Sequence, residues 1–314
     1  MVAKKMKRKY YLSMMLNNDE TFTAVLCDIK SSREYKDFER WKTQEKLFKA
    51  INLVNKLYKE ELYFPFDFSS GDSIQALFTS PRIAFECCLL LRTFFYPYSL
   101  RFGIGIGNVN NYFISNASRA SKLRLGTNFY DGIAYHKAMD ALTTGKMEES
   151  EIVINTGKEA QDNVLNRLLK ISSPFAMTDS SQQRKIIFFL SNLISPISSN
   201  PLFAEKYCRN LNEIFDVVSL GNESIIERLN PEIKQIIRDS VMRRRDYLAH
   251  SRTEQDYYGS MFTPRDDLYI AKILDVSEQN VSNIRRKAGL KDIRNNEIAV
   301  YNYLGFIEEK KYDY

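Results

Sequence analysis

Strand-like and helix-like segments alternate over the first half of this 314-residue chain. A nearly continuous apolar run, Thr21–Ile29, predicts a central strand buried on both faces. Residues Asp37–Glu60 repeat apolar side chains every three, four or seven positions, which predicts an amphipathic helix whose apolar stripe includes Phe38, Trp41 and Phe48. Two strands, a helix and a strand are then predicted over Phe64–Phe68, Ser73–Phe78, Ile83–Phe95 and Ser99–Ile106. This order predicts the split βαβ arrangement of a ferredoxin-like sheet, with helices covering one face.

The second half of the chain has a helical pattern without predicted strands after residue 158. A helix over Gly132–Leu142 and a last strand over Glu151–Asn155 complete the mixed region near residue 158. Beyond it the periodicity predicts helices alone, including single helices over Leu202–Leu220 and Pro231–Ala249. The predicted fold class is therefore α+β, a palm followed by an all-α region. The predicted domains are a palm over 20–158, a helical connector over 159–262 and a helix-turn-helix domain over 263–314.

Composition limits the classes of function. The formal charge of +6, from 45 basic and 39 acidic residues, permits a nucleic-acid partner without requiring one. The four cysteines form no CxxC pair and do not cluster with the two histidines, which argues against a zinc site and favours reduced core cysteines. No apolar stretch is long enough to predict a membrane span. We therefore expect a soluble, cytoplasmic protein with no membrane partner.

Two aspartates mark the candidate site. Asp28 ends the first predicted strand, and Asp72 follows Gly71 in the connection between the second and third. In a split βαβ sheet the first and third strands are neighbours, so both carboxylates reach one edge of the sheet. Two hard oxygen anions at one edge predict a site for Mg²⁺ or Mn²⁺, which in turn holds nucleotide phosphates. Gly71 suits a phosphate site because glycine lets the backbone approach closely.

Four segments then carry a resemblance to a known family: TAVLCDIKSSRE, SSGDSIQALF, RFGIGIGNV and LGTNFYDGIAYHKAMDAL. Together they resemble the palm of the class III nucleotide cyclases and, more closely, SatD-like proteins, over about residues 20–158. The resemblance implies that Asp28 and Asp72 are metal ligands assisted by the Ile29 carbonyl. It also implies that a nucleoside triphosphate or related nucleotide lies against Gly71 and the segment formed by Lys30, Ser31, Ser32 and Arg33.

The chain also departs from active cyclases, which carry an Asn and an Arg on the helix after the glycine-rich strand. That helix here reads His136, Lys137, Ala138, Met139 and Asp140, and Met139 stands where the arginine is expected. The arginine stabilises charge on the transferred phosphoryl group, so cyclisation is in doubt. His136 and Lys137 are the candidates to supply positive charge, and catalytic residues stay unassigned.

The segment Leu268–Ala288 has the spacing of a helix-turn-helix. Ala271 is the small residue at the helix crossing, Asp275 occupies the turn, Ser277 caps the second helix and Gly289 ends it. Amides pair with adenine edges, and arginines with guanine or phosphate. The predicted DNA-binding residues are Gln279, Asn280, Asn283, Arg285 and Arg286.

Three functions remain open from the sequence. The first is a DNA-binding regulator, acting as a homodimer, whose palm binds a metal-nucleotide complex. The second is an active, metal-dependent nucleotidyl cyclase or polymerase-like enzyme that makes a nucleotide second messenger. The third has the palm as a dimerisation module only. Metal-dependent nucleotide binding separates the third from the others, and product formation separates the second from the first.

Overall fold

A computed structural model gives the structure of the chain. It describes residues 21–109, 132–171, 182–198, 201–221, 231–250 and 264–309. The predicted helix-and-strand order of the first half is present, within a mixed α and β fold built on one five-stranded sheet. The segment LGTNFYD, at residues 125–131, lies outside the described residues.

The sheet has the strand order β2-β3-β1-β4-β5. Strand β1 lies at its centre and pairs antiparallel with β3 and β4, while β5 joins the other side of β4 in parallel. Every residue of β1 is buried, as the apolar run predicts. The strand bounds are Phe22–Ile29 (β1), Leu62–Ser70 (β2), Ser73–Phe78 (β3), Leu100–Gly107 (β4) and Ile152–Asn155 (β5).

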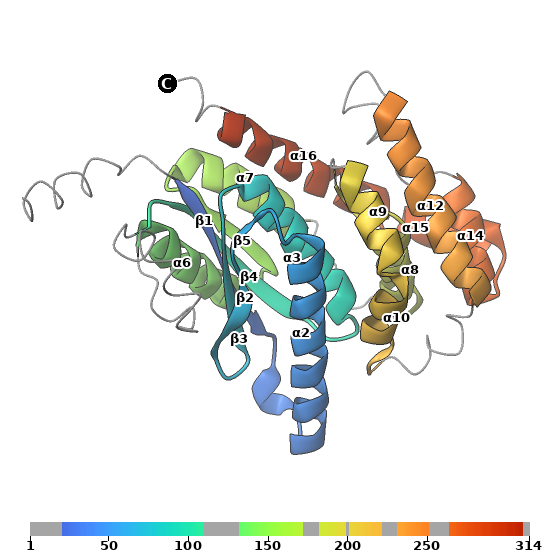
Figure 1. The fold of residues 1–314 in the computed structure, drawn as a ribbon, viewed down its shortest axis with the longest axis horizontal. Coiled ribbons are helices and arrows are strands. Elements are labelled where there is room, and N and C mark those ends of the chain that lie inside the picture. The colour runs from blue at the N-terminus through green and yellow to red at the C-terminus, as the bar shows by residue number, and fades with distance from the viewer. Residues whose placement is uncertain are drawn as a thin grey trace, which may run out of the picture.

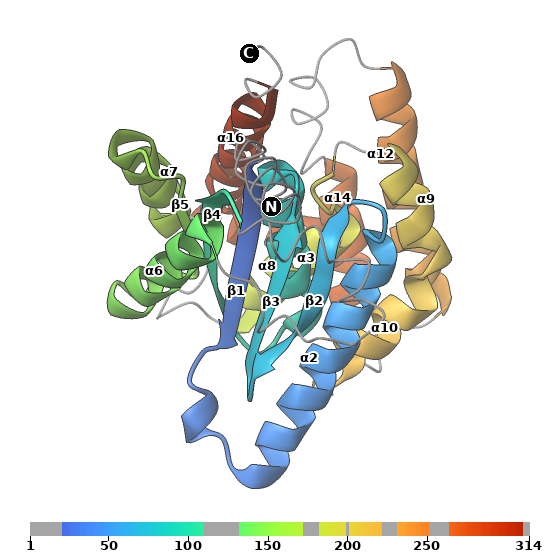
Figure 2. The same cartoon turned by 60° about the vertical axis from the view of Figure 1, so that its left-hand side comes forward.

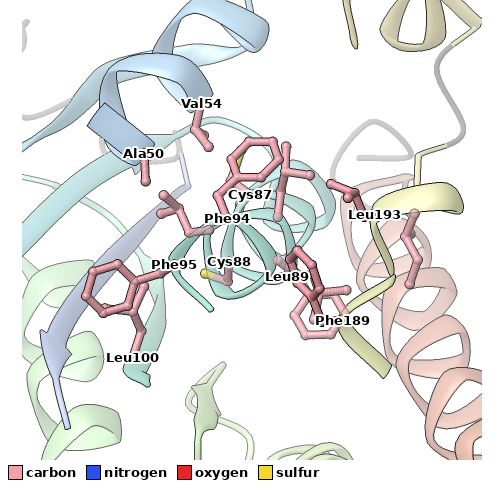
Figure 3. Close-up of a cluster of buried hydrophobic side chains, with 14 of the residues drawn as sticks. Ala50, Val54, Cys87, Cys88, Leu89, Phe94, Phe95, Leu100, Phe189 and Leu193 are labelled. Carbon is pink, nitrogen blue, oxygen red and sulfur yellow. The ribbon is translucent and has the colours of Figure 1, made fainter. Parts of the chain in front are cut away.

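Helices α2 (Asp37–Leu57) and α3 (Pro81–Phe95) pack on one face of the sheet. Helix α3 begins where the sequence predicts, because the Ser80 hydroxyl accepts a hydrogen bond from the Ile83 amide at 3.2 Å. Figure 3 shows α3 side chains such as Cys87 and Phe94 held between α2 and the later helix α8 (Gln182–Ile194). All four cysteines are free and buried, in agreement with the sequence.

Helix α6 (Ile133–Met147) covers the opposite face, so the prediction that helices cover one face is wrong (Figure 1). The alternate β1 residues Phe22, Ala24 and Leu26 pack against this helix. Helix and strand approach closely because β4 carries glycines at the crossing. A Cβ at Gly103 or Gly105 would lie 2.1 Å from a backbone oxygen of α6. Burial of both faces therefore explains why β1 reads as a nearly continuous apolar run rather than an alternating one.

The helical region wraps α2 and α3. Its described helices are α7 (Glu159–Ile171), α8 (Gln182–Ile194), α9 (Pro201–Arg209), α10 (Leu211–Ser219) and α12 (Pro231–His250). The single helix predicted over Leu202–Leu220 is wrong, because the chain breaks at Asn210, whose side-chain amide donates to the Lys206 carbonyl at 2.7 Å. The break lets α9 and α10 each pack against α2.

A buried lysine ties this region to α2 and to the end of α3. Lys46 of α2 is fully buried, and its Nζ donates to the carbonyl oxygens of Tyr96 at 2.5 Å, Val218 at 3.2 Å and Leu220 at 2.6 Å. Three backbone acceptors replace the water that the ammonium loses on burial. Burial nevertheless lowers the pKa of Lys46 to about 7.

Three helices end the chain: α14 (Pro264–Leu274), α15 (Glu278–Lys287) and α16 (Leu290–Glu309). The sequence did not predict α16, which runs back to pack on α3 and α7 (Figure 1). One hydrophobic cluster therefore extends from β1 through α8 to α16. Among the described residues, no helix is both long and apolar enough to span a membrane.

Candidate functional site

The pairing of the strands brings Asp28 and Asp72 to one end of the sheet. Cys27 of β1 lies opposite Ile74 of β3, so Asp28 lies beside Ser73, the residue after Asp72. On its other side Asp28 lies opposite Arg101 of β4. The prediction that the two acids share a sheet edge therefore holds for their backbone positions.

Two cations surround the carboxylate of Asp28, whose side chain is 12% exposed. Lys146 Nζ of α6 lies 2.5 Å from Asp28 Oδ2, and Arg101 Nη1 lies 3.9 Å from Oδ1. Oδ1 has no hydrogen-bond partner in the described part of the chain. The Lys146 side chain is half exposed, whereas that of Arg101 is 13% exposed. The site thus combines a buried acid, a mostly buried arginine and a half-exposed lysine that contacts the acid directly.

Lys146 and Arg101 were missed by the sequence analysis. The predicted helix ended at Leu142, five residues before the observed end of α6 at Met147. A signal for the longer helix exists, because the buried small residues Ala134, Ala138 and Gly145 continue one helical stripe. Extending the helix along that stripe would have placed Lys146 at the end of the sheet that holds Asp28.

The hairpin that carries Asp72 is tight. Ser70 pairs with Ser73, which leaves Gly71 and Asp72 as a two-residue loop. Gly71 has φ 57°, as the first loop residue of such a hairpin requires, and no atom lies within 4 Å of a Cβ placed on it. Asp72 is partly exposed. The backbone at Gly71 therefore borders open space next to the two aspartates.

The segment after β1 turns sharply. Ile29 is the last residue of β1 and its side chain is buried in the core. The Lys30 amide donates to the Ser99 carbonyl at 2.9 Å, Ser31 adopts a left-handed φ of 58°, and a 3-10 turn, η1 (Ser32–Glu34), follows. The side chain of Arg33 lies outside the described part of the structure. Among the predicted nucleotide contacts, Lys30 to Ser32 lie at the same sheet end as Asp28.

The two candidate catalytic residues lie elsewhere. Lys137 Nζ donates to the carbonyl oxygens of Ile106 at 2.7 Å and Thr156 at 2.8 Å. Ile106 pairs with Thr23 at the start of β1, so Lys137 lies at the opposite end of the sheet from Asp28. His136, its neighbour on α6, is exposed. The prediction that His136 or Lys137 serves the aspartate site is therefore wrong, because α6 runs the length of the sheet and presents Lys146 there instead.

Helix α15 carries a row of polar side chains. Asn283 Oδ1 accepts from Arg286 Nη2 at 2.9 Å and from Gln279 Nε2 at 3.5 Å. These three residues follow the spacing i, i+4, i+7, and hence lie on one face of the helix. Gln279, Asn280 and Arg286 are exposed, and Asn283 is partly so. Four of the five predicted DNA contacts are thus accessible on α15.

Arg285 faces inward and departs from that prediction. Its Nη1 lies 2.8 Å from Asp267 Oδ1, and its Nη2 donates to Asp267 Oδ2 at 2.8 Å. Only 13% of the Arg285 side chain is exposed. Adjacent residues point about 100° apart on a helix, so Arg285 fastens α15 to α14 while Arg286 faces outward. The assignment of Arg285 to DNA is therefore corrected to an internal ion pair.

The turn between α14 and α15 has the predicted local geometry. Asp275 adopts φ 55°, which aspartate tolerates better than most residues. The Ser277 hydroxyl accepts from the Asn280 amide at 3.2 Å and caps α15. Gly289, with φ 62°, ends the segment before α16 begins. Val281 and Ala271 are buried where the two helices pack.

Comparison with known proteins adds one identification. Neither the curated proteins nor the solved structures contain a match to this chain. A family match covers residues 22–232, about two thirds of the sequence, and includes the sheet, both aspartates and the first helices of the helical region. The chain belongs to the SatD family.

Proposed function

We propose that this SatD-family protein is a DNA-binding regulator whose sheet region binds a nucleotide together with Mg²⁺ or Mn²⁺. The observation that carries the proposal is the polar row on α15, in which Gln279, Asn283 and Arg286 share one accessible face. Side chains of these types bind base edges and phosphates. The sheet region contributes the second half of the proposal through Asp28 and Asp72.

The comparison with a cyclase-like palm rests on topology. The order β1-α2-β2-β3-α3-β4, with the strands arranged as β2-β3-β1-β4, supports the proposal of a ferredoxin-like arrangement of the kind that such palms share. Two elements are added to this arrangement. Helix α6 covers the face of the sheet opposite α2 and α3, and strand β5 extends the sheet beyond β4. This likeness supports a nucleotide as the ligand of the aspartate edge.

The residues at that edge suit a divalent cation shared with a phosphate. Asp28 and Asp72 supply hard oxygen donors, and the buried Asp28 Oδ1 lacks a hydrogen bond within the described residues. No group of three or more metal-binding side chains gathers in that part of the chain, so phosphate and water would complete the coordination. A bound metal ion would neutralise the charge of the Asp28 carboxylate. Lys146 could then contact a phosphate group instead of Asp28.

The helix-turn-helix assignment rests on α14 and α15. A three-residue turn joins them, and the buried pair formed by Arg285 and Asp267 holds α15 rigidly against α14. A recognition helix must be fixed in this way, because base contacts require a defined orientation in the major groove. The outward face of α15 then supplies Gln279, Asn280, Asn283 and Arg286 to DNA.

DNA binding is tested by gel shift with the full chain over a salt series, using genomic fragments. Arg286→Ala should weaken binding, and Asn283→Ala should reduce the preference among sequences by roughly 1–3 kcal/mol. Arg209→Ala, which removes an exposed arginine from α9, is the matched control. If Arg286→Ala binds as Arg209→Ala does, or if the wild type prefers no fragment, α15 does not read DNA.

Nucleotide binding is tested by calorimetry with each triphosphate, with and without Mg²⁺. Asp72→Asn should abolish the metal-dependent part of the affinity, whereas Asp216→Asn, on the exposed side of α10, should not change it. Equal affinity with and without metal would refute the metal site. The cyclase alternative predicts a cyclic product by mass spectrometry. We expect none, because α6 contains no arginine and Met139 is half exposed.

A further inference from the structure

A small pocket opens between the end of α3 and helix α8. It has a volume of about 120 Å³ and is walled mainly by aromatic side chains, which include Tyr98, Phe188 and Phe189. Two other lining residues, Pro97 and Lys185, are exposed, so this α8 pocket reaches the surface. A cavity of about 150 Å³ admits benzene. The α8 pocket therefore has room for about one ring.

The α8 pocket is separate from the aspartate site. Helices α3 and α8 lie on one face of the sheet, whereas the Asp28 carboxylate contacts Lys146 of α6 on the opposite face. Figure 2 shows α6 on one side of the sheet, with α2 and α9 on the other. The two sites share one end of the sheet, because the carbonyl of Ser99 at the pocket accepts from the Lys30 amide at 2.9 Å. Neither Asp28 nor Asp72 lines the pocket.

The polar side chains inside the pocket are engaged by the protein itself. Thr93 Oγ1 donates to a carbonyl oxygen of α3 at 2.9 Å, and Asn192 Nδ2 donates to one of α8 at 2.9 Å. Arg92 carries a charge, but its Nη2 lies 2.7 Å from Glu297 Oε1 and its Nη1 lies 3.5 Å from Glu151 Oε2. Because these groups bind within the protein, the interior favours an apolar ring over a polar ligand.

The mouth of the pocket is positive. Arg184 and Lys185 lie in the first turn of α8, and that turn contains no acid. A helix N-terminus carries a partial positive charge and usually attracts acids, so two cations there are repelled by it. No acidic side chain is among the described residues that line the pocket. An anionic group beside Lys185 would relieve this repulsion.

We propose that the α8 pocket is an effector site for a small aromatic carboxylate, with its ring against Phe188 and Tyr98 and its carboxylate at Lys185. The size of the pocket admits one ring, the engaged polar groups of the interior favour an apolar one, and the positive mouth selects an anion. A neutral ring lacks the contact with Lys185. An aliphatic acid such as acetate lacks the contacts with the aromatic walls.

Helix α8 connects the pocket with the last helices of the chain. It packs against both α14 and α15, and Asn192 Oδ1 accepts from Arg294 Nη1 of α16 at 2.8 Å. A ligand that fills the pocket holds α8 against α3 and so favours one position of α15 relative to the sheet. The consequence for DNA rests on the proposed function, whereas binding in the pocket does not.

Titration of the full chain with benzoate, followed by saturation-transfer NMR without DNA or nucleotide, tests the pocket. Benzoate should bind with a Kd below about 5 mM, and benzyl alcohol and acetate should each bind more weakly. Lys185→Gln should weaken benzoate binding by roughly two- to fivefold, as expected for an exposed ion pair. Lys170→Gln, at an exposed position of α7, is the matched control and should not change it. A weaker Kd for benzoate, equal affinities for benzoate and benzyl alcohol, or an unchanged affinity in Lys185→Gln overturns the inference.

Two further variants separate the pocket from its surroundings. Ser99→Phe places a ring in the pocket and should abolish benzoate binding; if this variant does not fold, Lys185→Gln at its exposed position still decides. Asp72→Asn should leave the benzoate affinity unchanged. A loss of benzoate binding in Asp72→Asn would make the pocket a part of the candidate metal site and would overturn the inference.

Hydrogen–deuterium exchange with and without benzoate tests the effector role. Exchange should slow in α14 and α15 as well as in α3 and α8 when benzoate is bound. Slowing confined to α3 and α8 overturns the effector role. None of these measurements uses DNA, so a failure of DNA binding refutes the proposed function and leaves the results for the pocket unchanged.

Discussion

Replacing Arg92 with methionine should destabilise the fold strongly, because this arginine sits between two buried carboxylates. Its Nη2 lies 2.7 Å from Glu297 Oε1 of α16, and its Nη1 lies 3.5 Å from Glu151 Oε2 beside β5. The Arg92 side chain is 7% exposed, and the two glutamates are 3% exposed or less. Methionine keeps much of the volume and the contact with the Phe188 ring but removes the charge.

The magnitude follows from Glu151, which loses its ion pair with Arg92, whereas Glu297 keeps Arg294 Nη1 at 3.4 Å from its Oε2. Removing one partner of a buried ion pair costs about 3–5 kcal/mol, which we expect for Arg92→Met at pH 8. Burial raises the pKa of Glu151 to about 7 even with Arg92 present, and loss of the arginine raises it further. A carboxyl with a raised pKa is protonated in the folded state as pH falls, and a neutral carboxyl no longer needs the arginine. The unfolding free energy lost through Arg92→Met should therefore be smaller at pH 5 than at pH 8, by about 1–2 kcal/mol.

Urea denaturation followed by circular dichroism at pH 8 and pH 5 measures both values. Arg209→Met is the control, because Arg209 pairs with Glu205 on an exposed helix surface and should contribute under about 1 kcal/mol. If Arg92→Met loses no more stability than Arg209→Met at pH 8, the buried network does not hold α16 to α3. An equal loss at both pH values would refute the role assigned to Glu151.

Three further predictions concern stability. Gly105→Val should lower the melting temperature, with a cost of about 1–3 kcal/mol or more, because even a Cβ at that site would lie 2.1 Å from the α6 backbone; Gly145→Ala, whose Cβ meets its nearest atom at 3.1 Å, should cost less. Arg285→Ala should destabilise the protein by about 1–3 kcal/mol in urea, whereas Arg286→Ala should not, since only Arg285 pairs with a buried aspartate. Burial raises the pKa of Glu86 from 4.5 to about 7, so the unfolding free energy should fall by about 3 kcal/mol as pH rises through that window. Glu86→Gln should flatten this dependence of stability on pH. An unchanged pH profile in the variant would contradict the raised pKa.

The local elements of the α/β region were predictable because short-range patterns define them. The run Thr21–Ile29 has no polar face, so only a strand buried on both sides could accommodate it. Ser80 and Ser277 precede helices with the spacing that a capping hydroxyl requires. The order of strands then fixes which ends meet, and this is why the shared edge of Asp28 and Asp72 could be predicted.

The remaining features depend on contacts between residues far apart in the sequence. Apolar periodicity placed Phe38, Trp41 and Phe48 in a helix but could not say which face the core would cover, and all three side chains are exposed. The cations beside Asp28 come from α6 and β4, and their approach depends on the packing of α6 over Gly103 and Gly105. Arg285 and Arg286 are equivalent in sequence, yet Asp267 of another helix selects one of them for an ion pair. Secondary structure follows from neighbouring residues, whereas the identity of a partner is decided when distant elements pack.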